Sequence, residues 1–145
     1  RLPYATVKNV GEAFLKSYKH DFTFAYPPFR LFNTYGPKQS KDFVVSPFIN
    51  RALKNEDISI YGDGKQTRTF CFIDDNIEAT TNAYYQNKFL NDVVNIGGSE
   101  EITILDLANT IIKITNSKSK ISYLPPLKEG DMTRRKPETT KMKQR

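Results

Sequence analysis

The sequence is poor in cysteine and has no long apolar run, and each shortage excludes a class of protein. A single cysteine, Cys71, rules out an internal disulfide and a metal site built from several cysteines. It lies between Phe70 and Phe72, so we expect it to be buried by packing rather than reactive. No stretch approaches the ~20 apolar residues that a membrane-spanning helix needs. We therefore expect no membrane partner.

Histidine and targeting signals are equally scarce. The only histidine, His20, falls at the end of a predicted helix, where a positive charge suits the helix dipole. We assign it no catalytic role and predict no metal site. The first residues, Arg1-Leu2-Pro3, lack the apolar core of a secretory signal. Together with the single cysteine, this leads us to expect a reducing, cytoplasmic location.

Positive charge, by contrast, is abundant. The chain has 145 residues, the size of one ordinary domain, and 22 Lys and Arg against 16 Asp and Glu give a net charge of +6. Seven basic residues against three acids fall in residues 128–145. This surplus favours an anionic partner, which is either a nucleic acid or the phosphates of a small ligand; a solvated terminus is the third interpretation. Because no nucleic-acid-binding motif is present, we expect no nucleic-acid partner.

Helical and strand-like patterns alternate along the chain, which predicts an α/β fold. Apolar residues at helical spacing predict helices over 4–19, 44–54, 75–87 and 104–115. Strands are predicted over 22–32, 58–61, 67–73, 93–96 and 121–124, although Pro27-Pro28 interrupts the first. Thr103 is the predicted N-cap of the last helix, and Asp74 or Asp75 that of the third.

Tyr4 and Lys8 form the most informative local pattern. Four residues make about one helical turn, so the phenol and the ammonium group project from the same face of the first helix. A nearby cation lowers the pKa of a tyrosine from its usual value of about 10. Such a tyrosine can take a proton from a hydroxyl group or return one. A helix-surface pair without function is the alternative.

Five blocks of sequence together extend this pattern to a family. In this order and spacing they resemble the C-terminal half of the NAD-dependent nucleotide-sugar epimerases and dehydratases, which are extended short-chain dehydrogenases/reductases. Within that family the chain is most similar to UDP-glucuronate decarboxylases. The blocks are residues 4–8, 30–37, 44–48, 61–70 and 134–137.

The resemblance implies a specific architecture. Residues 1–35 and 73–98 would belong to a doubly wound, Rossmann-type parallel sheet that binds the dinucleotide. Residues 36–72 and 99–145 would form a smaller α/β lobe for the nucleotide sugar. Relatives usually dimerise through the helix that bears the Tyr/Lys pair, so a homodimer of the complete protein is expected.

Catalytic and cofactor roles also follow from the resemblance. Tyr4 would be the base and acid at the sugar 4-hydroxyl, and Lys8 would hold the nicotinamide ribose of NAD. The family's Gly-rich turn and the Ser/Thr that partners Tyr4 are not found in these 145 residues. We therefore expect a fragment that holds NAD poorly and is inactive alone.

Substrate-binding roles are implied for residues in the other blocks. Asn33 would donate to the diphosphate or the sugar, or else cap its loop. Arg68 would bind the diphosphate, because a guanidinium group matches phosphate geometry, and Arg135 would face the same phosphates or the sugar. A surface arginine is the alternative for Arg68, and a solvated basic tail is the alternative for Arg135. The nucleotide surface would comprise Val44, Val45, Phe48, Tyr61 and Gln66, with core packing equally open for Val44, Val45 and Phe48.

The chemistry after oxidation at C4 is less defined by these residues. The resemblance favours decarboxylation through a 4-keto intermediate. A UDP- or dTDP-sugar 4-epimerase, a 4,6-dehydratase and a non-catalytic nucleotide-sugar-binding remnant all stay open.

Overall fold

The computed structural model describes residues 2–22, 24–127 and 132–143, with the side chains of Leu2 and Tyr4 left out. The elements follow one another as α1 (Leu2–Phe22), β1 (Phe29–Leu31), β2 (Thr34–Tyr35), α2 (Val45–Leu53), β3 (Ile58–Tyr61), β4 (Thr67–Thr69), β5 (Cys71–Phe72), α3 (Ile73–Tyr85), β6 (Val94–Ile96), β7 (Glu101–Thr103), α4 (Ile104–Ile114), β8 (Ile121–Leu124), β9 (Arg134–Arg135) and α5 (Thr140–Lys143). Helices and mainly parallel strands confirm the predicted α/β class.

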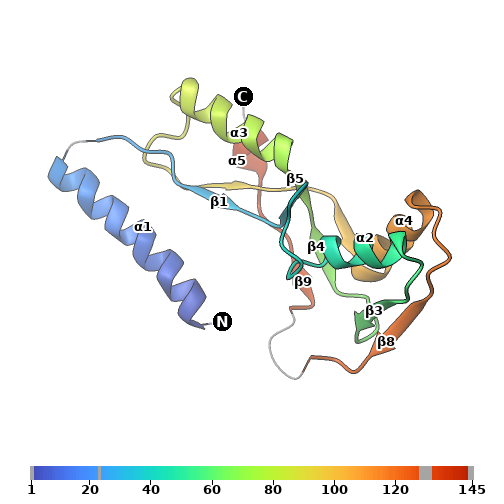
Figure 1. Ribbon diagram of the computed structural model, residues 1–145. Coiled ribbons are helices and arrows are strands. Elements are labelled where there is room, and N and C mark those ends of the chain that lie inside the picture. The colour runs from blue at the N-terminus through green and yellow to red at the C-terminus, as the bar shows by residue number, and fades with distance from the viewer. Residues whose placement is uncertain (1, 23, 128–131, 144–145) are drawn as a thin grey trace.

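The strands form small groups rather than one continuous sheet. β1 pairs in parallel with β6, β2 with β5, and β3 with β8. A fourth group has β4 at its centre, antiparallel to β7 and parallel to β9. In Figure 1, α1 lies apart at one side of the molecule, whereas α2 and α4 lie with β3 and β8 at the opposite side.

The main core lies between α2, α4 and β3. On each helix the buried residues recur at spacings of three or four, which places them on one face. On β3 they alternate, so that Ile58 and Ile60 are essentially inaccessible to solvent. Burying each such large side chain contributes ~1.5–3 kcal/mol to folding. The buried cluster comprises Phe48, Ala52, Ile58, Ile60, Ile104, Ala108 and Ile111.

Two predicted strands are shorter than the sequence pattern suggested. Only Phe29–Leu31 of the 22–32 segment pairs with β6, because Pro27 and Pro28 carry no N–H group to donate to a ladder. The 67–73 segment divides at Phe70. Its first half, β4, joins β7 and β9, and its second half, β5, pairs with β2.

Of the two predicted N-cap residues, the structure confirms one. Thr103 is the N-cap of α4, and its Oγ1 accepts a hydrogen bond from the Asp106 backbone N–H at 2.9 Å. The prediction for α3 was wrong, because Phe72 occupies the N-cap position. Asp74 and Asp75 lie instead in the first turn, where their charges favour the positive end of the helix dipole.

Helix α1 carries an apolar stripe that is exposed in this structure. Val7, Phe14 and Phe22 are each at least 60 % exposed. The helix is tied to β1 by Arg30, whose Nε and Nη2 donate to the two carboxylate oxygens of Glu12, each at 2.6 Å. None of the helices in the described ranges has the length and apolarity that crossing a membrane requires.

Candidate functional site

A cavity of about 540 Å³ opens between α2, β3 and β4. Six of the eight residues predicted to bind substrate lie around it, although they come from segments far apart in the sequence. Apolar side chains of α2 and the core form part of its wall, and polar groups come from the strands and loops. The six are Asn33, Val44, Phe48, Tyr61, Gln66 and Arg68.

Asn33 occupies the bend between β1 and β2. Its φ of 32° is left-handed, a conformation that asparagine tolerates better than most residues. Its side-chain Nδ2 donates to the Thr69 carbonyl at 2.9 Å, and its own carbonyl accepts from the Cys71 N–H at 3.2 Å. Both bonds fix the side chain beside β4. An amide nitrogen has a second N–H group, so Asn33 keeps donor capacity beyond the bond to Thr69.

Arg68 projects from the central strand β4 toward the cavity. Its Nη1 donates to the carbonyls of Thr67 and Met132, both at 2.7 Å, which orients the guanidinium group. Arg135 is the direct partner of Arg68 in the β4–β9 ladder. Arg135 is exposed and is not among the described residues that line the cavity. The two predicted phosphate-binding residues are nevertheless neighbours across adjacent strands.

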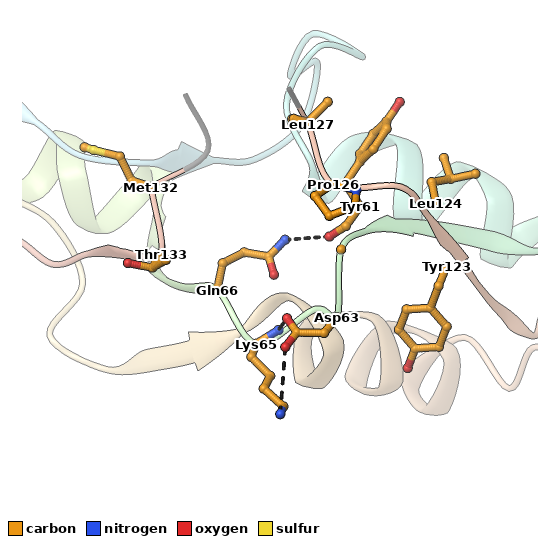
Figure 2. A pocket seen from close by; sticks show the side chains of 11 residues that line it. Tyr61, Asp63, Lys65, Gln66, Tyr123, Leu124, Pro126, Leu127, Met132 and Thr133 are labelled. Carbon is orange, nitrogen blue, oxygen red and sulfur yellow. Dashed lines mark hydrogen bonds and ion pairs between the residues drawn. The ribbon is translucent and has the colours of Figure 1, made fainter. Parts of the chain in front are cut away.

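Tyr61 and Gln66 stand at the mouth of the cavity, on either side of the turn through Gly62 and Gly64. Both glycines have φ near +70°, which lets the chain reverse tightly. Figure 2 shows Gln66 directed toward the backbone of Tyr61, where its Nε2 donates to the Tyr61 carbonyl at 3.1 Å.

Figure 2 shows the residues that line a second hollow, which has a volume of about 950 Å³. The two hollows are neighbours, because both are lined by Tyr61, Gln66, Leu124 and Leu127.

The predicted apolar surface on α2 divides between two sides of the helix. Val44 and Phe48 line the cavity, and Phe48 is also part of the core. Val45 is buried but faces a different hollow, beside Tyr35 and Pro37. Its predicted position at the nucleotide surface therefore differs from what the structure shows, because one residue along a helix turns the side chain by about 100°.

The Tyr4/Lys8 pair lies on α1, away from the cavity. Lys8 is exposed and is not one of the described residues around the cavity, and the Tyr4 side chain lies outside the described residues. In Figure 1 the N-terminal end of α1, which bears the pair, lies on the side of the molecule that carries β9 and β3.

Cys71 is buried, as predicted from its aromatic neighbours. It is 8 % exposed, and burial raises the pKa of its thiol above the usual value, which keeps the sulfur protonated. A protonated buried thiol is a poor nucleophile, so Cys71 serves packing.

Several cavity residues were missed. Arg51 completes the α2 wall, and its Nη1 donates to the Asp57 carbonyl at 2.7 Å. The signal was available, because Val44, Pro47, Phe48 and Arg51 follow the i, i+3, i+4, i+7 spacing of one helix face. Asp42, Ser59, Leu124 and Leu127 also line the cavity, and no local pattern distinguishes them.

A comparison with known protein families identifies the family of this chain. Residues 1–97 match the model of the NAD dependent epimerase/dehydratase family. The chain belongs to this family. The parallel β1–β6 pair is consistent with the Rossmann-type α/β fold of this family.

Individual relatives show which members of the family the chain is similar to. This family member is 40 % identical over 124 residues to a UDP-N-acetyl-alpha-D-glucosaminuronate decarboxylase of Bacillus cytotoxicus, a match covering 79 % of the chain and 38 % of the relative. It is 38 % identical over 117 residues to UDP-glucuronic acid decarboxylase 4 of Arabidopsis thaliana, covering 79 % of the chain and 26 % of the relative. The chain thus spans well under half the length of these relatives.

A solved structure gives the same picture. The crystal structure of a UDP-glucuronic acid 4-epimerase from Bacillus cereus, in complex with UDP-glucuronic acid and NAD, superposes with a TM-score of 0.86 at 32 % identity. The match covers 97 % of this chain and 45 % of that one.

Proposed function

We propose that the chain carries the nucleotide-sugar-binding surface of an NAD-dependent enzyme, with UDP-glucuronate decarboxylation as its reaction. The observation that supports this most strongly is the gathering of Asn33, Tyr61, Gln66 and Arg68 around one cavity. The sequence motifs predict substrate binding for these same residues. The decarboxylases of Bacillus cytotoxicus and Arabidopsis thaliana support the choice of reaction.

Each part of the substrate has a matching group in this proposal. Arg68 and Arg135 bind the diphosphate, because two guanidinium groups on adjacent strands offer paired donors to adjacent phosphates. Asn33 donates to the diphosphate or the sugar. The nucleoside rests on the apolar wall formed by Val44 and Phe48, with Tyr61 and Gln66 at the rim and Val45 supporting the wall from behind.

Tyr4 and Lys8 would carry the chemistry and hold NAD. The exposed Lys8 side chain, one turn from Tyr4 on the same helix, fits a role in binding a ribose. Bound NAD supplies a hydride acceptor for the sugar C4–H. Tyr4 takes the proton of the 4-hydroxyl, and the ammonium group of Lys8 favours the phenolate form that does so. The resulting 4-keto sugar acid is a β-keto acid, which loses its carboxyl group as CO₂.

The domain division also belongs to this proposal. Residues 1–35 and 73–98 contribute to the dinucleotide domain, and 36–72 and 99–145 form the substrate lobe. The complete protein acts as a cytoplasmic homodimer, with the exposed side of α1 in the dimer interface. Because no Gly-rich dinucleotide-binding turn occurs in the 145 residues, the chain alone is expected to be inactive.

Two alternatives share the same binding surface. A 4-epimerase or 4,6-dehydratase would use the same Tyr4 step, and the Bacillus cereus neighbour is a 4-epimerase. A non-catalytic binding module would keep the cavity and dispense with the Tyr4/Lys8 pair. In Figure 1, α1 lies apart from α2 and β3, beside which the cavity opens, and this separation favours the binding module for the isolated chain.

Calorimetric titration of the chain with UDP-glucuronate tests the proposal. We expect saturable binding that Arg68→Ala abolishes and that Lys113→Ala leaves unchanged. Lys113 is the matched control, since it is an exposed cation in the last turn of α4 and does not line the cavity. A folded sample that shows no binding heat, or equal binding by Arg68→Ala, would contradict the proposed substrate surface.

A further inference from the structure

Strand β9 consists of only two residues, Arg134 and Arg135, and yet it sets the position of one proposed phosphate-binding group. It is held to β4 in parallel register, with Arg134 opposite Thr67 and Arg135 opposite Arg68. The Thr67 N–H also donates to the Thr133 carbonyl at 2.9 Å. A strand this short has few ladder bonds, so its position depends on side-chain contacts.

Glu101 supplies those contacts from the far side of β4. It lies on β7, the other neighbour of β4, opposite Thr69. Its two carboxylate oxygens accept from Nε and Nη2 of Arg134 at 2.8 and 2.7 Å, a two-point pair with fixed geometry. Thr67 Oγ1 donates to the same carboxylate at 3.0 Å, and Lys136 Nζ lies 3.3 Å from it. One carboxylate thus connects all three strands of this sheet.

The pleat of the sheet separates this clamp from the proposed phosphate-binding groups. Side chains alternate between the two faces of a strand, and partners in a ladder share a face. Thr67 and Arg134 therefore lie on the Glu101 side. Arg68 and Arg135 lie on the opposite side, where Arg68 lines the cavity.

The charges around β9 also need Glu101. Arg134, Arg135 and Lys136 are consecutive, and they lie beside Arg68. Hydrogen bonding from Arg134, and then from Thr67 and Lys136, lowers the pKa of Glu101 to about 2. The carboxylate consequently stays ionised at any pH at which the protein would work. It offsets the repulsion that would otherwise push β9 away from β4.

We propose that Glu101 is a positioning residue for diphosphate binding: through Arg134 it holds β9 in register, so that Arg135 stands beside Arg68 on the same face of the sheet. Glu101 itself does not touch the ligand. This inference rests on the proposed function, because it assigns Glu101 to the same nucleotide-sugar site.

A double-mutant cycle with UDP as the probe tests this role. Affinity is measured by calorimetry for the unchanged chain, Glu101→Gln, Arg135→Ala and the double variant. We expect Glu101→Gln to weaken UDP binding about fivefold or more in the original background, and less than about twofold when Arg135 is already alanine. A general loss of structure would weaken binding equally in both backgrounds. Glu100→Gln is the matched control, since it removes the same charge from the exposed neighbour and should leave affinity unchanged.

The outcomes separate the inference from the proposed function. If UDP does not bind the unchanged chain, or binds the Arg68→Ala variant as tightly as the unchanged chain, the proposed function fails and the role of Glu101 fails with it. If UDP binding requires Arg68 but Glu101→Gln stays within about twofold, only the role of Glu101 is overturned. An equal loss in both Arg135 backgrounds overturns it too. Should Glu101→Gln not fold, Arg134→Gln breaks the same ion pair from β9, and the cycle with Arg135→Ala is read in the same way.

Discussion

Helix α1 and the lobe built on α2 and α4 both carry apolar stripes at helical spacing, but only the lobe buries them. Phe48, Ala52 and Ala108 lie in the shared core, whereas Val7 and Phe14 of α1 are largely exposed. The lobe encloses its stripes because α2, α4 and β3 pack against one another around a shared core. An apolar stripe predicts that this face of a helix packs against another surface. The stripe is buried only where that second surface is present. The cavity that the proposed substrate-binding residues line lies in the lobe, where the apolar stripes are buried.

The largest effect should come from breaking the core of the lobe. Ile58→Ala removes a side chain that is fully buried on β3, and we expect a loss of ~2–5 kcal/mol in the free energy of unfolding. Urea denaturation followed by circular dichroism measures it. Ile114→Ala is the matched control, since the same side chain is 78 % exposed there and should change stability by less than ~0.5 kcal/mol. Equal losses in both variants would mean that the lobe has no core of the kind described.

Glycine-to-alanine changes should affect stability with opposite sign in α1 and after β6. A Cβ at Gly98 would stand 2.1 Å from the Phe70 carbonyl oxygen, so Gly98→Ala must displace the backbone after β6 and should cost ~1–3 kcal/mol. Gly11 lies inside α1 with open space around it, and Gly11→Ala should stabilise that helix by ~0.5–1 kcal/mol. Thermal unfolding and the helical signal at 222 nm measure the two effects. A destabilised Gly11→Ala variant would show that α1 is packed against something on that side.

The smallest effect should come from the Arg30–Glu12 tether between α1 and β1. The bond from Arg30 lowers the pKa of Glu12 below its ordinary value of 4.5. A carboxylate with a lowered pKa contributes its stability above its ordinary pKa, and loses it as the pH falls through the lowered value. The tether should therefore weaken below about pH 4.5, by no more than ~1 kcal/mol because the pair is partly exposed.

Hydrogen exchange at the amides of Phe24, Ala25 and Tyr26, measured between pH 6 and pH 3 and corrected for the intrinsic rate, follows that release. Glu12→Gln should remove the pH dependence while leaving exchange in β3 unchanged. If amide exchange still depends on pH in Glu12→Gln, another carboxyl group causes that dependence.

The sequence allowed the parts of the fold with strong local signals to be predicted. The helices of the lobe, the β3 and β8 strands and the Thr103 cap follow from periodicity and capping chemistry. Six cavity residues were identified through the family motifs, and their convergence in space is what the structure added.

Other features depend on contacts between distant segments, and local patterns carry no signal for them. The two-residue strands β2, β5 and β9 exist only through their ladder partners. The division at Phe70 arises because β4 and β5 pair with different neighbours. Glu101 gave no signal, since an acid at the start of a short strand is an ordinary surface residue until Arg134 is placed opposite it.

The β3–β8 ladder has a consequence for the order of events during synthesis. Ser59 and Ser122 are hydrogen-bonded partners that lie 63 residues apart in the chain. Strand β3 and the cavity wall beside it cannot acquire their partner until Leu124 has left the ribosome exit tunnel. Residues 58–61 therefore remain an unpaired apolar strand while about 63 further residues are synthesised, a stage at which chaperones bind and aggregation begins.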